Sequence, residues 1–465
     1  MKRLALAVAA LCLLAAPAFA HAAGRGFVML LPTGWVIAGG ALAVLVSFIM
    51  VSRLPRLAMK APASVAPLSP IVAQVMSLVS ALILAALIFV GFAGPRDPVE
   101  NLLPLAIWTL WWVEIVILHP LFGNLWEAIN PFTGPHALLT GRFGRAANAA
   151  PLRYPPWASY WPAVLIFFGF AWFQLVYPAP EDPAILAVAV LVYLAVSFAG
   201  VLAFGLKAWL GRADPFAVFL SQLGAAAPFG RGGLRWPGAG LLSLPVLPLS
   251  GVIFVLLTLG CITFDGFANT FLWLSMIGIN PLDFPGRSEV MGANTLGILL
   301  VSGVLAAGFF AAVWAGWALA GRPHSLARLC GRLVYSLIPI SIAYHFAHYL
   351  ADTLVKSQYL LLALNDPFET DANLLGIGHA HVMTSFQNTA SGALAIYVAQ
   401  TAALVIGHVI GVAVAHSMVV EEGPSAQRVM TLGCRWRCAW WPTRVLDCGC
   451  WGHRRFRRAN NVLSR

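Results

Sequence analysis

The chain has 465 residues, of which 60% are hydrophobic and only 10% are charged. Soluble globular proteins do not have this composition, whereas proteins that cross a membrane many times do. The formal net charge is +11, but the basic residues lie in loops between apolar segments and in the C-terminal tail. This placement is typical of membrane topology signals and argues against nucleic-acid binding.

Residues 1–20 have the pattern of a signal peptide. Two basic residues precede an apolar stretch over residues 4–15, and residues 18–20 form a small-x-small cleavage site. We therefore expect a mature chain that begins at His21, outside the cytoplasm. The alternative is an uncleaved first helix.

Nine apolar segments follow, each close to the roughly 20 residues that the hydrocarbon core of a bilayer requires. They lie at about 33–52, 71–94, 101–122, 157–177, 184–207, 241–263, 293–320, 332–354 and 393–419. With His21 outside, most Lys and Arg residues of the loops fall on the cytoplasmic side, as the positive-inside rule requires. We therefore predict an all-α fold, a polytopic transmembrane helical bundle of nine spans over residues 21–420.

Segments outside these spans carry separate predictions. Residues 214–223 are expected to form a helix at the membrane interface. Residues 264–292 and 355–392 are the long outer loops, where functional residues concentrate. Residues 421–465 form an Arg- and Trp-rich stretch without a helical pattern, which we expect to be a disordered, basic cytoplasmic tail. Its cysteines fit a zinc site only loosely.

The eighth span contains the chemically most informative stretch, from Tyr344 to Asp352. His345 and His348 are three residues apart and Asp352 is four further on, so all three project from one helix face. Ionisable residues inside a membrane helix are costly and usually functional. With His408 in the ninth span they form a donor set that suits a divalent metal, zinc or manganese first, with copper as an alternative.

Two further histidines, His379 and His381, lie in the predicted outer loop between these spans and are additional candidate metal ligands. Hydrogen bonding between helices is the alternative role for such histidines. His345 or His348, together with His408, could also serve as axial ligands of a b-type haem.

Two residues are candidates for catalysis. Asp265 lies where the sixth span reaches the outer face, which makes it a candidate base or ligand, with a turn residue as the alternative. Tyr344 could supply a proton or a supporting hydroxyl. Glu114 lies within the third span, where its alternative role is pairing with a polar neighbour such as Gln174.

Several stretches resemble a family of bacterial membrane proteins known as fenitrothion hydrolases. The similar stretches are residues 31–33, 41–48, 172–182, 263–266, 342–350 and 407–416, and the resemblance covers roughly residues 25–420. It implies hydrolysis of an aryl dialkyl phosphorothioate with release of a nitrophenol. The chain departs from the family at Gln174, where an acid is expected, and in the tail beyond residue 421.

These observations together predict a metal-dependent hydrolase of organophosphorus triesters in the bacterial inner membrane, with its site facing the periplasm. The metal would lower the pKa of a bound water, and Asp265 or Asp352 would accept the proton. The expected partners are the lipid bilayer, a small apolar substrate and a second membrane subunit. A b-type haem protein is one alternative, and a metal-handling or transport protein without catalysis is another.

Overall fold

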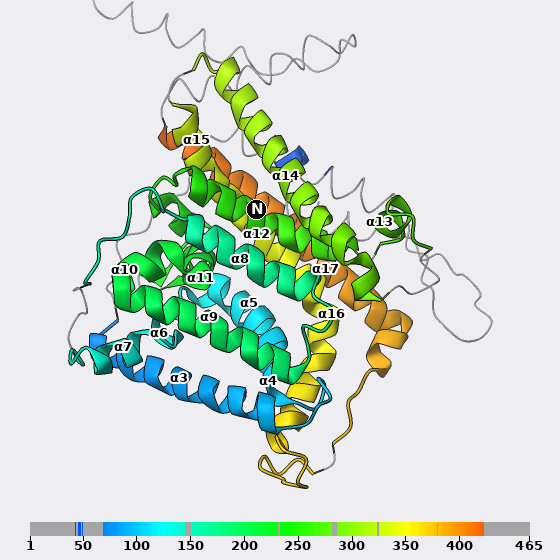
Figure 1. Ribbon diagram of the computed structural model, residues 1–465. Helices are drawn as coiled ribbons and strands as arrows, with labels where there is room; N and C mark the ends of the chain where they lie inside the picture. The colour runs from blue at the N-terminus through cyan, green and yellow to red at the C-terminus, as the bar shows by residue number, and fades with distance from the viewer. Residues whose placement is uncertain are drawn as a thin grey trace, which may run out of the picture.

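The computed structural model describes residues 68–422, except for 145–149, 231–232, 269, 281–285, 323–324 and 379, together with a few positions between 42 and 49. The predicted signal peptide, most of the predicted first span and the tail from residue 423 lie outside the described residues. The described chain is an all-α bundle with one short pair of strands (Figure 1).

Seven helical segments in the described part of the chain are long and apolar enough to cross a membrane. They are α3 (Pro70–Ala93), the run of α4 (Leu102–Leu105), η1 (Ala106–Ile115) and α5 (Val116–Phe122), α9 (Pro183–Phe204), α12 (Leu249–Ala268), α14 (Arg287–Leu319), the run of α15 (Leu326–Leu333), η5 (Val334–Leu337) and α16 (Ile338–Asn365), and α17 (Ala390–Glu421). The chain is therefore a membrane protein that associates with a lipid bilayer.

Shorter elements connect these segments. They are α6 (Trp126–Ile129), α7 (Thr133–Leu139), α8 (Trp161–Leu175), α10 (Leu206–Ala208), η2 (Trp209–Ala213), α11 (Pro215–Ala225), η3 (Ala239–Ser243), α13 (Phe271–Met276) and η6 (Ser385–Asn388). The strands β1 (Phe229–Gly230) and β2 (Gly233–Leu234) pair antiparallel. The segment predicted to span at 157–177 is helix α8, which has only 15 residues and is short for a full crossing.

The helices pack in pairs. α3 packs on α9, α8 packs on α12, and α16 packs along much of α17 (Figure 1). The close approach of α16 and α17 depends on Gly407, because a Cβ there would collide with the Cβ of Ala343 and lie 2.7 Å from the carbonyl oxygen of Pro339. The contact fixes the position of α16, which carries His345 and His348.

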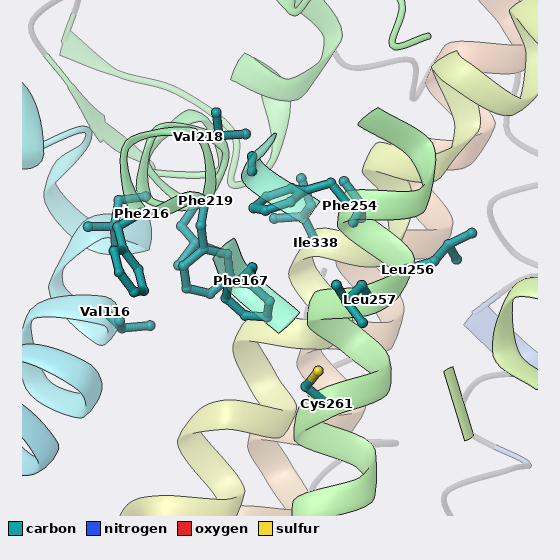
Figure 2. Close-up of a cluster of buried hydrophobic side chains, with 14 of the residues drawn as sticks. Val116, Phe167, Phe216, Val218, Phe219, Phe254, Leu256, Leu257, Cys261 and Ile338 are labelled. Carbon is teal, nitrogen blue, oxygen red and sulfur yellow. The ribbon is translucent and has the colours of Figure 1, made fainter. Parts of the chain in front are cut away.

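Helix α11 lies inside the bundle, so the prediction of an interfacial helix over residues 214–223 is wrong. Its Phe216 and Phe219 are buried. Phe219 contacts Phe167 of α8, which in turn contacts Phe254 of α12 (Figure 2), and Phe216 contacts Phe170 of α8. The helix is buried on all sides, Gln222 included, whereas an interfacial helix keeps one face in contact with water.

The chain contains two copies of one local arrangement. A long helix ends at a glycine with positive φ, Gly123 (97°) after α5 and Gly205 (82°) after α9. A short helical turn follows, and then a polar residue before Pro-Phe, which is Asn130 in the first copy and Asp214 in the second. The side chains of Asn130 and Asp214 both accept backbone N–H groups at the start of the next helix. No fixed-period repeat is visible in the sequence, because the connecting segments differ in length.

Candidate active site

The centre of the site is a contact between the end of α12 and the middle of α16. The Nε2 atom of His348 lies 3.0 Å from Oδ2 of Asp265. The side chains are 28% and 16% exposed, respectively, so each is mostly enclosed but reachable by water. The last turn of α12 therefore carries a carboxylate paired with an imidazole, at a depth where an unpaired charge would be expensive.

A tyrosine holds the same carboxylate oxygen. The hydroxyl of Tyr349 donates to Oδ2 of Asp265 at 2.6 Å. That hydroxyl in turn accepts from Nε2 of Gln174 on α8 at 2.9 Å and from Nε1 of Trp112 on η1 at 3.3 Å. The Tyr349 hydroxyl thus makes one donor and two acceptor contacts, so helices from four parts of the chain converge on Asp265.

Both donors reach the same oxygen of Asp265, and this determines what the carboxylate can do. Two donors on one oxygen are the arrangement expected of an ionised carboxylate, which only accepts hydrogen bonds. No hydrogen bond joins Oδ1 to the described part of the chain. Oδ1 is therefore the atom of Asp265 that can accept a proton from a molecule in the adjacent cavity.

The π-helix η1 brings Trp112 to this network in two ways. Its indole bonds to Tyr349, and its backbone carbonyl lies 2.9 Å from Nε2 of His345. In an α-helix that carbonyl would accept from the N–H of Val116, but here the Val116 N–H bonds to the carbonyl of Val113. π-Helical turns are frequent at functional sites because they redirect backbone and side-chain groups in this way.

A cavity of about 660 Å³ adjoins the Asp265–His348 pair. Aromatic and aliphatic side chains, including those of Trp108, Leu274 and Val290, form a large part of its lining. The cavity is large enough for a small organic molecule, and its lining combines these apolar side chains with about as many polar and charged ones.

The lining of the cavity also includes charged residues that are already paired. Nζ of Lys356 lies 3.2 Å from Asp352 and 3.1 Å from Glu181. Nη1 of Arg287, at the start of α14, donates to the carbonyl of Gln174 at 2.9 Å, which fastens α14 to the end of α8. The Lys356 ion pairs do not include Asp265 or His348, and no Lys or Arg among the described residues lies within ion-pair distance of Asp265.

The structure brings together some of the residues that the sequence singles out. Asp265, His348 and Tyr349 are in direct contact, and His345 joins the same network through Trp112. Asp352 is more than half exposed and is paired with Lys356, away from the Asp265 carboxylate.

The predicted metal ligands are not brought together in the described part of the chain. There, no group of three or more His, Cys, Asp and Glu side chains is arranged to hold a metal ion. His345 bonds to a backbone carbonyl, His408 lies 2.7 Å from the carbonyl of Leu404 on its own helix, and His381 is exposed. His379 lies outside the described residues, so its predicted role stays a prediction.

The geometry around His345 does not suit a haem either. The cavity that His345 lines has a volume of about 30 Å³, which has room for a water molecule or two and not for a porphyrin. Its Nε2 is also the atom that faces the carbonyl of Trp112.

Two polar residues of the third and fourth predicted spans have partners that the sequence does not reveal. Gln174, where the resemblance leads one to expect an acid, binds Tyr349 and not Glu114. Glu114 accepts from the hydroxyl of Ser357 on α16 at 2.5 Å. A glutamine among aromatic residues in an apolar helix is the sequence signal that could have revealed the role of Gln174, because such a residue needs a polar partner.

Comparison with other proteins adds no identity to this arrangement: no family model, no curated protein and no solved structure matches the chain.

Proposed function

We propose that the chain is a membrane-embedded hydrolase of organophosphorus triesters in which Asp265 acts as the general base. The observation that carries the proposal is the Asp265 carboxylate, which is held at Oδ2 by His348 and Tyr349 beside a 660 Å³ cavity and keeps Oδ1 available. The resemblance of the sequence to fenitrothion hydrolases supports the same reaction class.

The proposed reaction is a single displacement at phosphorus. Oδ1 of Asp265 accepts a proton from a water molecule, whose oxygen forms a bond to phosphorus. The bond from phosphorus to the aryl oxygen breaks, and the aryl oxide leaves with the electron pair and takes up a proton. The products are a dialkyl phosphorothioate and a nitrophenol, so one water is consumed for each ester bond that is broken.

The network around Asp265 prepares the carboxylate for this step. The hydrogen bonds from His348 and Tyr349 fix its orientation, and positioned general bases of this kind accelerate reactions by about 10²–10⁴-fold. Because a neutral triester with an aromatic leaving group partitions into lipid, we propose that it binds against the apolar wall formed by Trp108, Leu274 and Val290.

We extend the proposal to topology and location. The predicted cleaved signal peptide and nine spans place the mature N-terminus and the cavity on the periplasmic side of a bacterial inner membrane. The distribution of loop charges supports this orientation. A second membrane subunit remains a predicted partner.

A divalent metal is a separate prediction from the sequence. The described donors do not form a ligand set, and the step above uses no metal. Zinc or manganese would enter the mechanism only if His379, which lies outside the described residues, completed a ligand set. The other predicted ligands would then have to move closer together than the structure places them.

The decisive experiment compares two aspartates that line the same cavity. In purified, detergent-solubilised protein, Asp265→Asn should lower the rate of nitrophenol release from a nitrophenyl diethyl phosphorothioate by about 10²–10⁴-fold, because the amide cannot accept the proton. Asp352→Asn is the matched control and should stay within a few-fold of wild type, because Asp352 is paired with Lys356.

The same assay distinguishes the alternatives. Equal losses in both variants would contradict the assignment of Asp265 as the base. If the wild-type protein releases no nitrophenol at all, with or without added zinc or manganese, the hydrolase proposal fails. Metal handling or transport without catalysis then becomes the better account.

A further inference from the structure

One face of His348 has a neighbour that the proposed reaction does not use. A Cβ built on Gly266 would lie 2.9 Å from the hydroxyl oxygen of Tyr344 and 3.7 Å from Nδ1 of His348. Both polar atoms therefore lie close to the same position of α12, and no direct hydrogen bond joins them. Tyr344 and His348 are four residues apart on α16, the spacing at which helical side chains are neighbours.

The hydrogen-bonding state of His348 makes this arrangement meaningful. Nε2 faces the ionised Asp265 and must carry a proton to donate to it. In a neutral ring with its proton on Nε2, Nδ1 is the acceptor. A hydrogen-bond donor that faces Nδ1 therefore keeps the proton on Nε2. Of the atoms around a Cβ built on Gly266, the nearest is the Tyr344 hydroxyl, and Nδ1 of His348 lies close to the same point.

We infer that Tyr344 is a positioning residue for His348: its hydroxyl donates to Nδ1 through one bridging water and so keeps the proton of the imidazole on Nε2. Gly266 permits this arrangement because any side chain there would displace the Tyr344 hydroxyl. Tyr344 thereby keeps a hydrogen-bond donor on Asp265. The kinetic consequence rests on the proposed function, whereas the effect on the imidazole does not.

The inference is tested by nitrogen-15 NMR of protein labelled at histidine, with the signal of His348 assigned by its loss in His348→Gln. In wild type, His348 should report a proton on Nε2 and an acceptor at Nδ1. Tyr344→Phe should shift the population toward the other tautomer. Tyr359→Phe is the matched control on the same helix, about 22 Å further along, and should leave the signal unchanged.

A second variant guards against a simple folding effect. Gly266→Ala should perturb His348 in the same sense as Tyr344→Phe, and the double variant should show no larger effect than either single one. An alanine is intrinsically better in a helix than glycine, so α12 itself is not weakened. Gly292→Ala is the control, because a Cβ at Gly292 meets no atom within 4 Å.

Kinetics supply the second readout. Tyr344→Phe should lower kcat roughly five- to tenfold, the effect of one hydrogen bond of ordinary strength, and should leave KM unchanged. An unchanged tautomer in both Tyr344→Phe and Gly266→Ala overturns the inference even if hydrolysis is confirmed. A shifted tautomer in a protein that hydrolyses nothing would instead support the inference and reject the proposed function.

Discussion

Replacing Tyr349 by Phe should reveal how strongly the network holds Asp265. The change removes one oxygen atom and keeps the ring, so packing is conserved. It deletes the 2.6 Å hydrogen bond to the Asp265 carboxylate. It also leaves Nε2 of Gln174 and Nε1 of Trp112 without their acceptor.

The magnitude follows from the kinds of bond involved. A hydrogen bond to a charged group contributes about 1.5–3 kcal/mol, and each buried donor left unpaired adds a desolvation penalty. Neutral hydrogen bonds between membrane helices contribute only about 0.6 kcal/mol on average. We therefore expect Tyr349→Phe to lower the free energy of unfolding by about 2–4 kcal/mol, and Gln174→Leu, which removes one neutral bond, by about 0.6 kcal/mol.

Reversible unfolding in mixed detergent micelles, followed by tryptophan fluorescence, can measure both values because the chain has 17 tryptophans. The double variant should cost less than the sum of the two, since the residues share a bond. If Tyr349→Phe costs no more than Gln174→Leu, Asp265 is not an ionised carboxylate held by Tyr349, and the reasoning about its free oxygen fails as well.

Three further outcomes are expected. Lys356→Met should change the free energy of unfolding by less than about 1 kcal/mol, because its partners Asp352 and Glu181 are about half exposed and water screens such pairs; a larger loss in the same unfolding assay would show that this ion pair fastens the cavity wall. The hydrogen bond with Glu369 raises the pKa of Glu100, so the contact between their loops is fully present below the ordinary Glu pKa and is lost as the pH rises through the raised value. Limited proteolysis near Glu369 should accordingly increase with pH over that range, and Glu369→Gln should remove the dependence. Dialysis against a chelator should leave nitrophenol release unchanged, and a loss that added zinc or manganese restores would bring the predicted metal back into the mechanism.

Hydropathy predicts the helices well where proline marks their limits. Helices α3 and α9 begin at Pro70 and Pro183, each within one residue of the predicted start. Prediction is less accurate for α12, which begins at Leu249 and not near residue 241, because two prolines precede it. The buried position of α11 was not predictable from its own sequence, since an apolar helix can lie in a protein core or against lipid.

The site was predictable in its residues and not in their partners. Asp265 and His348 stand out because ionisable side chains are rare in apolar helices. Helical spacing places His345 and His348 on one wall, but it does not say which neighbouring helix each imidazole meets. In the structure His345 meets the backbone of η1 and His348 meets α12, so the expected shared metal site is divided between two partners.

Because η1 is a π-helix, the contacts of Trp112 with α16 depend on the number of residues in η1 as well as on their identity. A π-helix accommodates more residues per turn than an α-helix, so losing one residue between 106 and 115 would let the segment relax to α-helical geometry. The residues on one side of the deletion would then rotate by about 100° relative to the other side. The carbonyl and the indole of Trp112 would no longer reach α16 together. Substitution scans would not detect this dependence, whereas a scan of single-residue deletions would. A descendant of this chain could retain every side chain of the site and still lose it through one missing codon.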